Sequence, residues 1–314
     1  MYDLIGDIHG HADELLALLT QLGYERRHGV YRHPERQVVF LGDLIDRGPR
    51  IRETLEIVRP MVEAGAAHAV LGNHELNALA FHTADSDNPR EFLRPHTPKN
   101  VQQHSETLRQ LSDGDLASHL DWFRSLPMWL DLGSIRAVHA CWDEARMAEI
   151  AAERQGPLDA AFLHRACKPT GDLFAAVETV LKGKEAKLPH PLFFLDKDGH
   201  KRTFIRLRWF LDPAGHTYGS YALASPPVDC EQPLPDDIHE AAVPYPRTAP
   251  PVFVGHYWLV GDAPHLLAEN VACLDWSVAK QGFLCGYRWS GEAVLHGSGF
   301  RTTPSAKHLK AVVS

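Results

Sequence analysis

Long hydrophobic runs are missing from this chain of 314 residues. No apolar stretch approaches the about 20 residues that a membrane-spanning helix needs, so no such helix is expected. The first five residues lead straight into a glycine–aspartate motif and leave no room for the charged leader and apolar core of a signal peptide. We therefore expect no targeting segment at this end and no membrane partner.

Cysteine is also scarce. Five cysteines are present, an odd number, and no two of them form a C-x-x-C pair. This usage is typical of a reduced protein and predicts a cytoplasmic location. Cys141 lies two residues after His139, a candidate metal ligand, but a small apolar side chain that fills the core is the interpretation we favour for it.

An excess of positive charge is the third absence. The net charge is −8, so the global field favours neither nucleic acid nor an anionic membrane as a partner, although a local basic pocket for phosphate remains compatible with it. Hydrophobic residues make up 44 % of the chain, which is ordinary for a soluble globular protein long enough to bury a full core. Oligomeric state is left open by these quantities.

Three short glycine-flanked motifs stand out against this ordinary background. They are GDIHG at 6–10, GDLIDRG at 42–48 and GNHE at 72–75, and each follows a short apolar run. Aspartate, histidine and asparagine together suit a pair of divalent transition-metal ions. An arginine and a spare histidine beside such a pair are what hydrolysis of a phosphate ester requires.

The ordered trio resembles the signature of the phosphoprotein-phosphatase branch of the calcineurin-like metallophosphoesterase superfamily, which reads GDxHG, GDxxDRG and GNHE with two isolated histidines downstream. The resemblance covers residues 1–82, 128–143 and 251–296. It implies an α/β fold, a calcineurin-like αββα sandwich of two mixed sheets flanked by helices, with helical and hairpin insertions. It also implies a phosphoesterase that cleaves phosphate monoesters by in-line attack of a metal-bridging hydroxide.

The resemblance further implies a dinuclear site in which every ligand follows an apolar run. The ligands would be Asp7, His9, Asp43, Asn73, His139 and His256. Asp43 would bridge two divalent ions, Asp7 and His9 would complete the ligands of the first, and the other three would complete those of the second. Mn²⁺ is the expected metal, and Fe, Zn, Co and Ni suit the same ligands. His68 and His82 are rivals, but neither ends a strand in the right order.

The remaining polar residues of the motifs suggest catalytic roles. His74 is adjacent to Asn73, so the two side chains diverge, and His74 is better placed to protonate the leaving group. Asp46 is expected to orient that imidazole, unless the two form a merely structural ion pair. Arg47 offers a planar fork for two phosphate oxygens. Glu75 either supports the ligands from behind or only favours the first turn of a helix.

One further absence separates branches of the superfamily. Many of its nucleases and cyclic-nucleotide phosphodiesterases end in GHxH, whose last histidine binds the first metal. This chain reads Gly255-His256-Tyr257-Trp258, so that ligand is missing. Together with the Asp46–Arg47 pair, this departure favours the phosphoprotein-phosphatase branch.

The pattern along the chain predicts where these motifs lie. Strands are predicted at 4–5, 38–41, 69–71, 135–138 and 252–254, each ending at a candidate ligand. Helices are predicted at 13–22, 51–62, 101–111 and 113–126, with two or three more in 143–182. A hairpin is predicted at 192–209 with its turn at 197–200, then a proline-rich loop at 225–251 and short strands at 266–267, 271–274, 282–288 and 293–296. We expect a single domain at 1–300, with insertions at 83–127 and 144–250 and a loose tail at 301–314.

The insertions are where substrate choice is expected to lie. Arg206 and Arg208, in a basic hairpin, are candidates for a second phosphate-binding cation, although a solvated edge strand rich in Lys and Arg is the slightly favoured explanation. Trp209, Phe210 and Tyr221 would favour a nucleotide substrate if they stacked on a base, but core packing is the stronger interpretation of them.

Three functions therefore remain open. The first is a phosphomonoesterase, including one that acts on phosphoserine or phosphothreonine. The second is a hydrolase of diadenosine tetraphosphate or a similar dinucleoside polyphosphate, and the third is a catalytically silent metal-binding scaffold. The partner would accordingly be a phosphorylated small molecule, a nucleotide or a phosphoprotein. The presence of His74, Asp46 and Arg47 together argues against the silent scaffold.

Overall fold

The computed structural model describes residues 1–195, 201–223 and 229–304, and most of its strands lie in two mixed sheets. The larger sheet contains six strands: β1 (Tyr2–Ile5), β4 (Gln37–Phe40), β5 (Ala67–Ala69), β14 (Asp275–Trp276), β15 (Phe283–Trp289) and β16 (Phe300–Pro304). The smaller sheet contains four: β6 (Trp129–Asp131), β7 (Arg136–Val138), β12 (Val252–Val254) and β13 (Val271–Cys273). All five strands predicted to precede candidate ligands are present, although the one predicted at 69–71 lies at 67–69.

The register of the parallel strands brings the motifs to one level. Ile5 pairs with Phe40, and Phe40 pairs with Ala69, so β1, β4 and β5 end side by side. In the smaller sheet β7 and β12 are also parallel neighbours. Because the carboxyl ends of parallel strands meet at one edge of a sheet, the loops that follow these five strands can share one site.

The two sheets pack on each other through a buried apolar core. Their strands carry short runs of branched and aromatic residues, which suit a surface buried by sheet packing. The ring of Phe253 in the smaller sheet contacts that of Tyr287 in the larger sheet, with centroids 5.2 Å apart, and both side chains are fully buried. The predicted fold class, mixed α/β with sheets flanked by helices, is confirmed.

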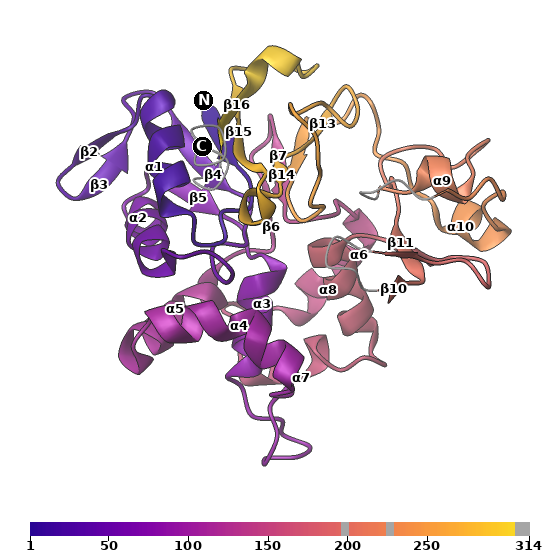
Figure 1. The fold of residues 1–314 in the computed structure, drawn as a ribbon, viewed down its shortest axis with the longest axis horizontal. Coiled ribbons are helices and arrows are strands. Elements are labelled where there is room, and N and C mark those ends of the chain that lie inside the picture. The colour runs from indigo at the N-terminus through magenta and orange to yellow at the C-terminus, as the bar shows by residue number, and fades with distance from the viewer. Residues whose placement is uncertain (196–200, 224–228, 305–314) are drawn as a thin grey trace, which may run out of the picture.

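Helices cover the larger sheet and build a second layer below it (Figure 1). α1 (Ala12–Gln21) and α2 (Ile51–Glu63) contact the larger sheet, while α3 (Asn73–Phe81) begins directly at the third motif. Leu15, Leu18 and Leu19 of α1 are buried in the core, as their spacing predicts, whereas Leu16 is half-buried. A separate hairpin, β2 (Glu25–Arg27) with β3 (Val30–Arg32), extends beyond α1.

The first insertion forms two helices close to the motif loops. α4 (Pro98–Gln110) and α5 (Asp113–Ser125) match the two predicted helices. Each begins at a capping side chain: Thr97 Oγ1 accepts from the amide of Asn100, and Ser112 Oγ accepts from the amide of Asp115. α4 contacts α2, and α5 contacts α3, so this insertion is packed against the helices that follow the motifs.

The second insertion begins with three helices and continues into two small sheets. The helices are α6 (Glu144–Glu153), α7 (Ala160–Ala166) and α8 (Asp172–Lys182). The predicted hairpin at 192–209 is only partly right: β9 (Phe194–Leu195) pairs with β10 (Lys201–Arg202), but β11 (Phe204–Arg206) pairs with β8 (Glu185–Lys187) instead. The predicted turn at 197–200 lies outside the described residues.

A lobe beside the sheets is built from this part of the chain (Figure 1). It contains the two small sheets and the short helices α9 (Tyr218–Tyr221) and α10 (Asp236–Ala241), the latter inside the predicted proline-rich loop. The lobe buries a small apolar cluster of its own around Leu188, Ile205 and Tyr221. Residues 224–228 lie outside the described part of the chain.

The end of the chain departs from two predictions. No strand forms at 266–267 or 293–296. Instead β16 pairs with β15, so residues 301–304, expected in a loose tail, complete the larger sheet, and 305–314 lie outside the described residues. Pairing with β15, the preceding strand, decided this, because local residue preference does not reveal which segments pair. None of the helices in the described part of the chain has the length and apolar character that crossing a membrane requires.

Candidate metal and catalytic site

Five loops, one after each motif-bearing strand, meet where the two sheets end. The loops after β1, β4 and β5 come from the larger sheet, and those after β7 and β12 from the smaller. The amide of Gly255 donates to the carbonyl of His139, which joins the two loops of the smaller sheet. The amide of His256 lies 3.1 and 3.2 Å from the two carboxylate oxygens of Asp7, which joins the two sheets.

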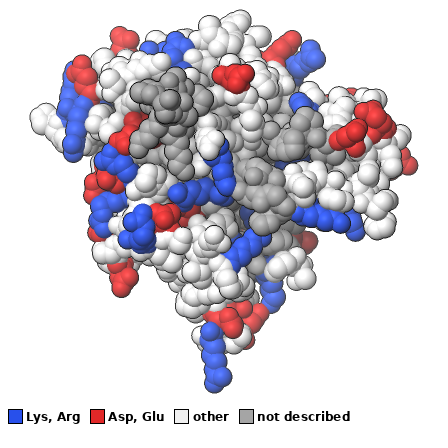
Figure 2. All heavy atoms as spheres, viewed as in Figure 1, with Lys and Arg blue, Asp and Glu red and all other residues white. Residues whose placement is uncertain are grey.

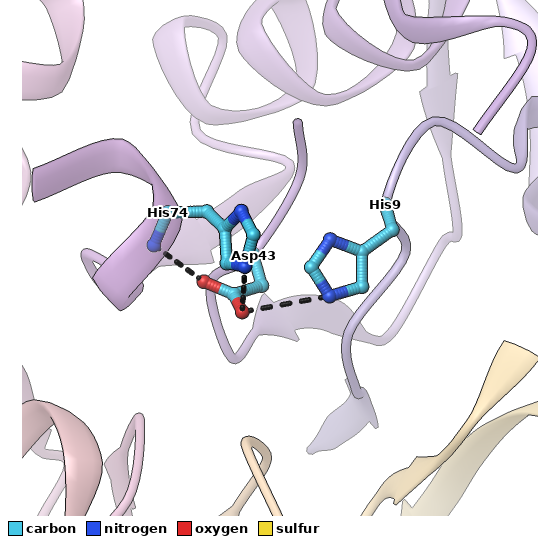
Figure 3. Close-up of side chains that lie close together, drawn as sticks. All are labelled: His9, Asp43 and His74. Carbon is cyan, nitrogen blue, oxygen red and sulfur yellow. Dashed lines mark hydrogen bonds and ion pairs between the residues drawn. The ribbon is translucent and has the colours of Figure 1, made fainter. Parts of the chain in front are cut away.

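Asp43 lies at the centre of these loops and is 1 % exposed. Figure 3 shows its carboxylate between the imidazoles of His9 and His74. Oδ2 lies 3.5 Å from Nε2 of His9, whereas Oδ1 lies 3.4 Å from Nε2 of His139. Each carboxylate oxygen therefore faces a different histidine, which is the arrangement that a bridging ligand requires.

Three of the other predicted ligands, together with His74, form two groups around this carboxylate. One group brings ligand atoms of His9, Asp43 and His74 within 4.8 Å of one another, and a second does the same for Asp7, Asp43 and His139. Asp7 thus lies close to His139 as well as to Asp43, and its predicted pairing with His9 at the first ion stays a prediction. The amide oxygen of Asn73 lies 3.1 Å from Nε2 of His139 and 2.7 Å from Nδ1 of His256.

Two glycines allow the loops to approach this closely. A Cβ on Gly72 would lie 2.2 Å from the amide nitrogen of Asp43, and a Cβ on Gly255 would lie 2.0 Å from a carboxylate oxygen of Asp7. Real Cβ atoms do not approach other atoms this closely, so any side chain at either position would push the ligand loops apart.

Glu75 holds the central loop from behind. Its carboxylate accepts hydrogen bonds from the amides of Asp43 (2.9 Å) and Leu44 (2.8 Å), and also from that of Gly72 (3.0 Å). The side chain is fully buried. Of the two interpretations left open for Glu75, the structure favours support of the ligand loop.

Charge is concentrated in this buried site. Burial, together with the nearby carboxylates of Asp275 and Asp43, raises the pKa of Asp7 well above its usual value. Burial opposes ionisation of Asp43 as well, but His139 and His74 outweigh it and hold the pKa of Asp43 well below its usual value. Carboxylates buried side by side repel one another, and bound cations would relieve that repulsion.

The residues present fit a metal centre. Within the described part of the chain, Nε2 of His9 is buried and has no hydrogen-bond partner, while Nδ1 of the same ring lies 2.9 Å from the carbonyl oxygen of Ile45. Nδ1 of His139 similarly lies 2.6 Å from the carbonyl oxygen of Leu41. A backbone carbonyl that orients one ring nitrogen leaves the other to bind metal, which is the usual arrangement around metal-binding histidines.

His74 is held from behind by Asp46. Nδ1 of His74 lies 2.6 Å from Oδ2 of Asp46, which leaves Nε2 pointing toward Asp43 at 3.9 Å. The other carboxylate oxygen of Asp46, Oδ1, lies 2.8 Å from Nδ1 of His104 and accepts a hydrogen bond from the hydroxyl of Thr107 at 2.6 Å. All four side chains are buried.

His104 and Thr107 were missed by the sequence analysis. Both lie on α4, which contains no motif, and only its packing brings them to Asp46. Burial would raise the pKa of Asp46, but the hydrogen bonds from His104 and His74 hold it well below its usual value. Nε2 of His104 lies in turn 3.3 Å from Nε2 of His82, the histidine considered a rival ligand.

We expect His104→Phe to lower kcat about tenfold, within the range measured when a group that orients an active-site ligand is lost. Without His104 the pKa of Asp46 rises, so the acidic limb of the pH–rate profile should move to higher pH. His104→Asn, whose amide can donate to the same carboxylate oxygen, should retain most of the activity. Equal pH profiles for the Phe variant and the unmodified protein would contradict this role.

Three arginines were considered as phosphate-binding residues, and their surroundings differ. Arg47, on the Asp43 loop, has its guanidinium 4.4 Å from the ring centroid of Trp258. Burial and then the charge of Arg206 lower the pKa of His256, and Arg206 itself forms an ion pair with Glu185. Arg208 instead donates from Nε to the carbonyl of Ala222.

The other sequence candidates are core residues. Trp209, Phe210 and Tyr221 are at most 4 % exposed, which fits the packing interpretation. Cys141 is fully buried, and burial raises the pKa of its thiol. No disulfide links any of the five cysteines.

Comparison with known proteins agrees with this geometry. The family model described as calcineurin-like phosphoesterase matches residues 2–179. A bis(5'-nucleosyl)-tetraphosphatase PrpE [asymmetrical] of Oceanobacillus iheyensis is 44 % identical over 139 residues, which cover 44 % of this chain and 54 % of that protein. The protein of the same name from Halalkalibacterium halodurans is 49 % identical over 74 residues, covering 23 % and 30 %.

A third relative carries a related name. The symmetrical bis(5'-nucleosyl)-tetraphosphatase of Hamiltonella defensa is 35 % identical over 126 residues, covering 40 % of this chain and 38 % of that protein. The matched segments thus span between about a third and a half of the relatives' length. The family model matches more than half of this chain and includes all three motifs, so the chain belongs to the calcineurin-like phosphoesterase family.

Proposed function

We propose that this protein is a phosphohydrolase that depends on two divalent cations and cleaves phosphate monoesters. The observation that carries the proposal is the position of Asp43, whose two oxygens face different histidines beside the His74–Asp46 pair. A catalytically silent metal-binding scaffold would have no need for the His74–Asp46 pair. We also propose a single domain over residues 1–300 and a cytoplasmic location.

The proposed ligands supply oxygen and imidazole nitrogen only. They are Asp7, His9, Asp43, Asn73, His139 and His256. Carboxylate, amide and imidazole ligands suit Mn²⁺, which we propose as the metal, and they also accept Fe, Zn, Co or Ni. When bound, the two cations would activate the attacking water and polarise the phosphate.

The protein's own contribution is to orient a proton donor and to bind the phosphate. Because Nδ1 of His74 donates to the carboxylate of Asp46, a second proton on this ring lies on Nε2, which faces the site. That proton is placed for transfer to the leaving oxygen. Arg47 would hold two phosphate oxygens with its planar fork.

A dinucleoside polyphosphate is the second candidate substrate. The names of the relatives favour it. So does the charge of Arg206, which would extend anion binding beyond one phosphate. The three buried aromatic residues of the second insertion do not favour it, because they cannot stack on a base without leaving the core.

A substrate panel with added Mn²⁺ would test the proposal. It would contain p-nitrophenyl phosphate, phosphoserine and phosphothreonine peptides, and diadenosine tetraphosphate, each assayed with and without a chelator. We expect chelator-sensitive release of phosphate from the monoesters. Turnover of diadenosine tetraphosphate alone would favour the second candidate, and no turnover of any substrate would contradict both.

Arg206 is expected to contribute a second contact to the substrate's phosphate. Figure 2 shows several Lys and Arg side chains across the middle of the face on view, with Asp and Glu side chains among them. We predict that Arg206→Ala raises KM about three- to tenfold, the effect of losing one partly solvated charge contact. Glu185 pairs with Arg206, so Glu185→Gln should lower KM by releasing that guanidinium.

Arg208→Ala provides the matched control for this prediction. It removes the same charge from the same segment, but its guanidinium bonds to the backbone at Ala222. We expect an unchanged KM for this variant, measured by steady-state kinetics with p-nitrophenyl phosphate. If both arginine variants have the same KM as the unmodified protein, substrate recognition must instead involve the first insertion.

A further inference from the structure

Trp258 occupies the position where related enzymes carry a second histidine of a GHxH motif, and its ring lies inside the site. The indole stacks on the imidazole of His9, with centroids 5.3 Å apart and planes 28° from parallel. Trp258 supplies no imidazole nitrogen to a metal ion, but its indole covers the ring of His9, one of the proposed ligands.

The loop that carries Trp258 is firmly held. The residue has a positive φ of 51°, and its amide donates to Oδ2 of Asp275 at 2.7 Å. Asp275 is 1 % exposed, and its other oxygen accepts from the amide of Ser277 at 3.0 Å. A non-glycine residue in the left-handed region is costly, so it is retained where the surrounding structure fixes it. The position of the indole is therefore determined by the fold.

The guanidinium of Arg47 lies over this indole. Its Cζ is 4.4 Å from the ring centroid, within the range of a cation–π interaction. Arg47 also has a positive φ, of 70°, and within the described residues its buried Nε has no hydrogen-bond partner. A carboxylate in place of the indole would consume the donors of Arg47 and neutralise its charge.

We propose that Trp258 is a positioning residue, which holds Arg47 toward the phosphate while leaving the charge and N–H donors of Arg47 available to that anion. The indole face fixes the plane of the guanidinium without hydrogen bonding to it. The inference rests on the proposed function, because it assigns a second residue to the same phosphate site. It replaces a metal-ligand role at this position with a role in substrate orientation.

Binding of inorganic phosphate to the Mn²⁺-loaded protein, measured by calorimetry, tests this role without requiring turnover. We expect Trp258→Leu to weaken phosphate binding about five- to tenfold and to raise KM by the same factor, because the cation–π contact in a partly desolvated site is lost. Trp258→Phe, which keeps an aromatic face, should weaken it about twofold. Both variants should bind as much metal as the unmodified protein.

A double-mutant cycle separates positioning of Arg47 from a direct or merely structural role. In the Arg47→Ala background, Trp258→Leu should change phosphate affinity less than twofold. The inference would be overturned if Trp258→Leu changed phosphate affinity equally with and without Arg47, or did not change it at all. Loss of bound metal from Trp258→Leu would also overturn it. Trp122→Leu removes another tryptophan that an arginine, Arg59, overlies at 5.9 Å, and it should leave phosphate affinity unchanged.

The outcomes also distinguish this inference from the proposed function. Phosphate binding that depends on Trp258 only when Arg47 is present, without hydrolysis of any substrate, would support the inference and contradict the function. Hydrolysis of the substrates without coupling between Trp258 and Arg47 would support the function and contradict the inference. An unmodified Mn²⁺-loaded protein that binds no phosphate would overturn the inference.

Discussion

Replacement of Asp43 by asparagine is expected to abolish hydrolysis and to reduce bound metal from two ions per chain to one or none. The carboxylate of Asp43 belongs to both groups of ligand atoms. Removing its charge therefore weakens the binding of both ions. The loss of turnover should exceed the about 10- to 100-fold that removal of an outer partner of a metal ligand costs. Metal content measured by elemental analysis, alongside turnover of p-nitrophenyl phosphate, checks both parts.

Asp3→Asn is the matched control. Asp3 is a fully buried carboxylate that pairs with Arg36 and Arg288 on the larger sheet, away from the motif loops. Its replacement should lower thermal stability, because it leaves two arginines without their partner, but should keep two ions per chain. An Asp43→Asn protein that retains both ions and its activity would exclude the bridging role.

Replacement of His74 by asparagine is expected to lower kcat about 10²–10⁴-fold while metal binding is retained, the usual scale for loss of a general acid. The loss should be smaller for p-nitrophenyl phosphate than for an alkyl phosphate, because a good leaving group needs less protonation. Steady-state kinetics with the two substrates measures the difference directly.

The dependence on the leaving group is the decisive part of this prediction. An equal loss for both substrates would show that His74 is not a proton donor, and a loss of metal would make it a ligand, as its distance of 3.9 Å from Asp43 also allows. His68→Asn is the control, because His68 lies within β5 and its ring centroid is 6.3 Å from that of Tyr2, at the start of β1. Its activity should equal that of the unmodified protein.

Four of the six proposed metal ligands could be picked out from the sequence because they lie in local motifs directly after β-favouring runs. Asp7, Asp43 and Asn73 follow three such runs, and the register of β1, β4 and β5 then places them together. Short apolar runs that end at polar residues determine strand ends with little help from the rest of the chain. The two histidines of the smaller sheet were harder to predict, since each is a lone residue that only parallel pairing of β7 and β12 brings to Asn73.

The roles of other residues depended on contacts that no local pattern reveals. His104 and Thr107 lie 58 and 61 residues from Asp46 along the chain, and the sequence shows them only as parts of a helix. Which face of α4 meets Asp46 depends on how that helix packs against its neighbours. The pairing of β11 with β8 was missed for the same reason, because either strand would serve as a partner by local preference.

The sequence by itself determined the family resemblance, the ligand types and the strands that present them, because motif chemistry and strand propensity are local. Tertiary structure decided how those groups are supported. It placed Glu75 behind the Asp43 loop, His104 behind Asp46 and Trp258 beneath Arg47. Such support requires side chains from distant segments to meet at hydrogen-bonding or stacking distance, and only the packing of the complete fold sets those distances.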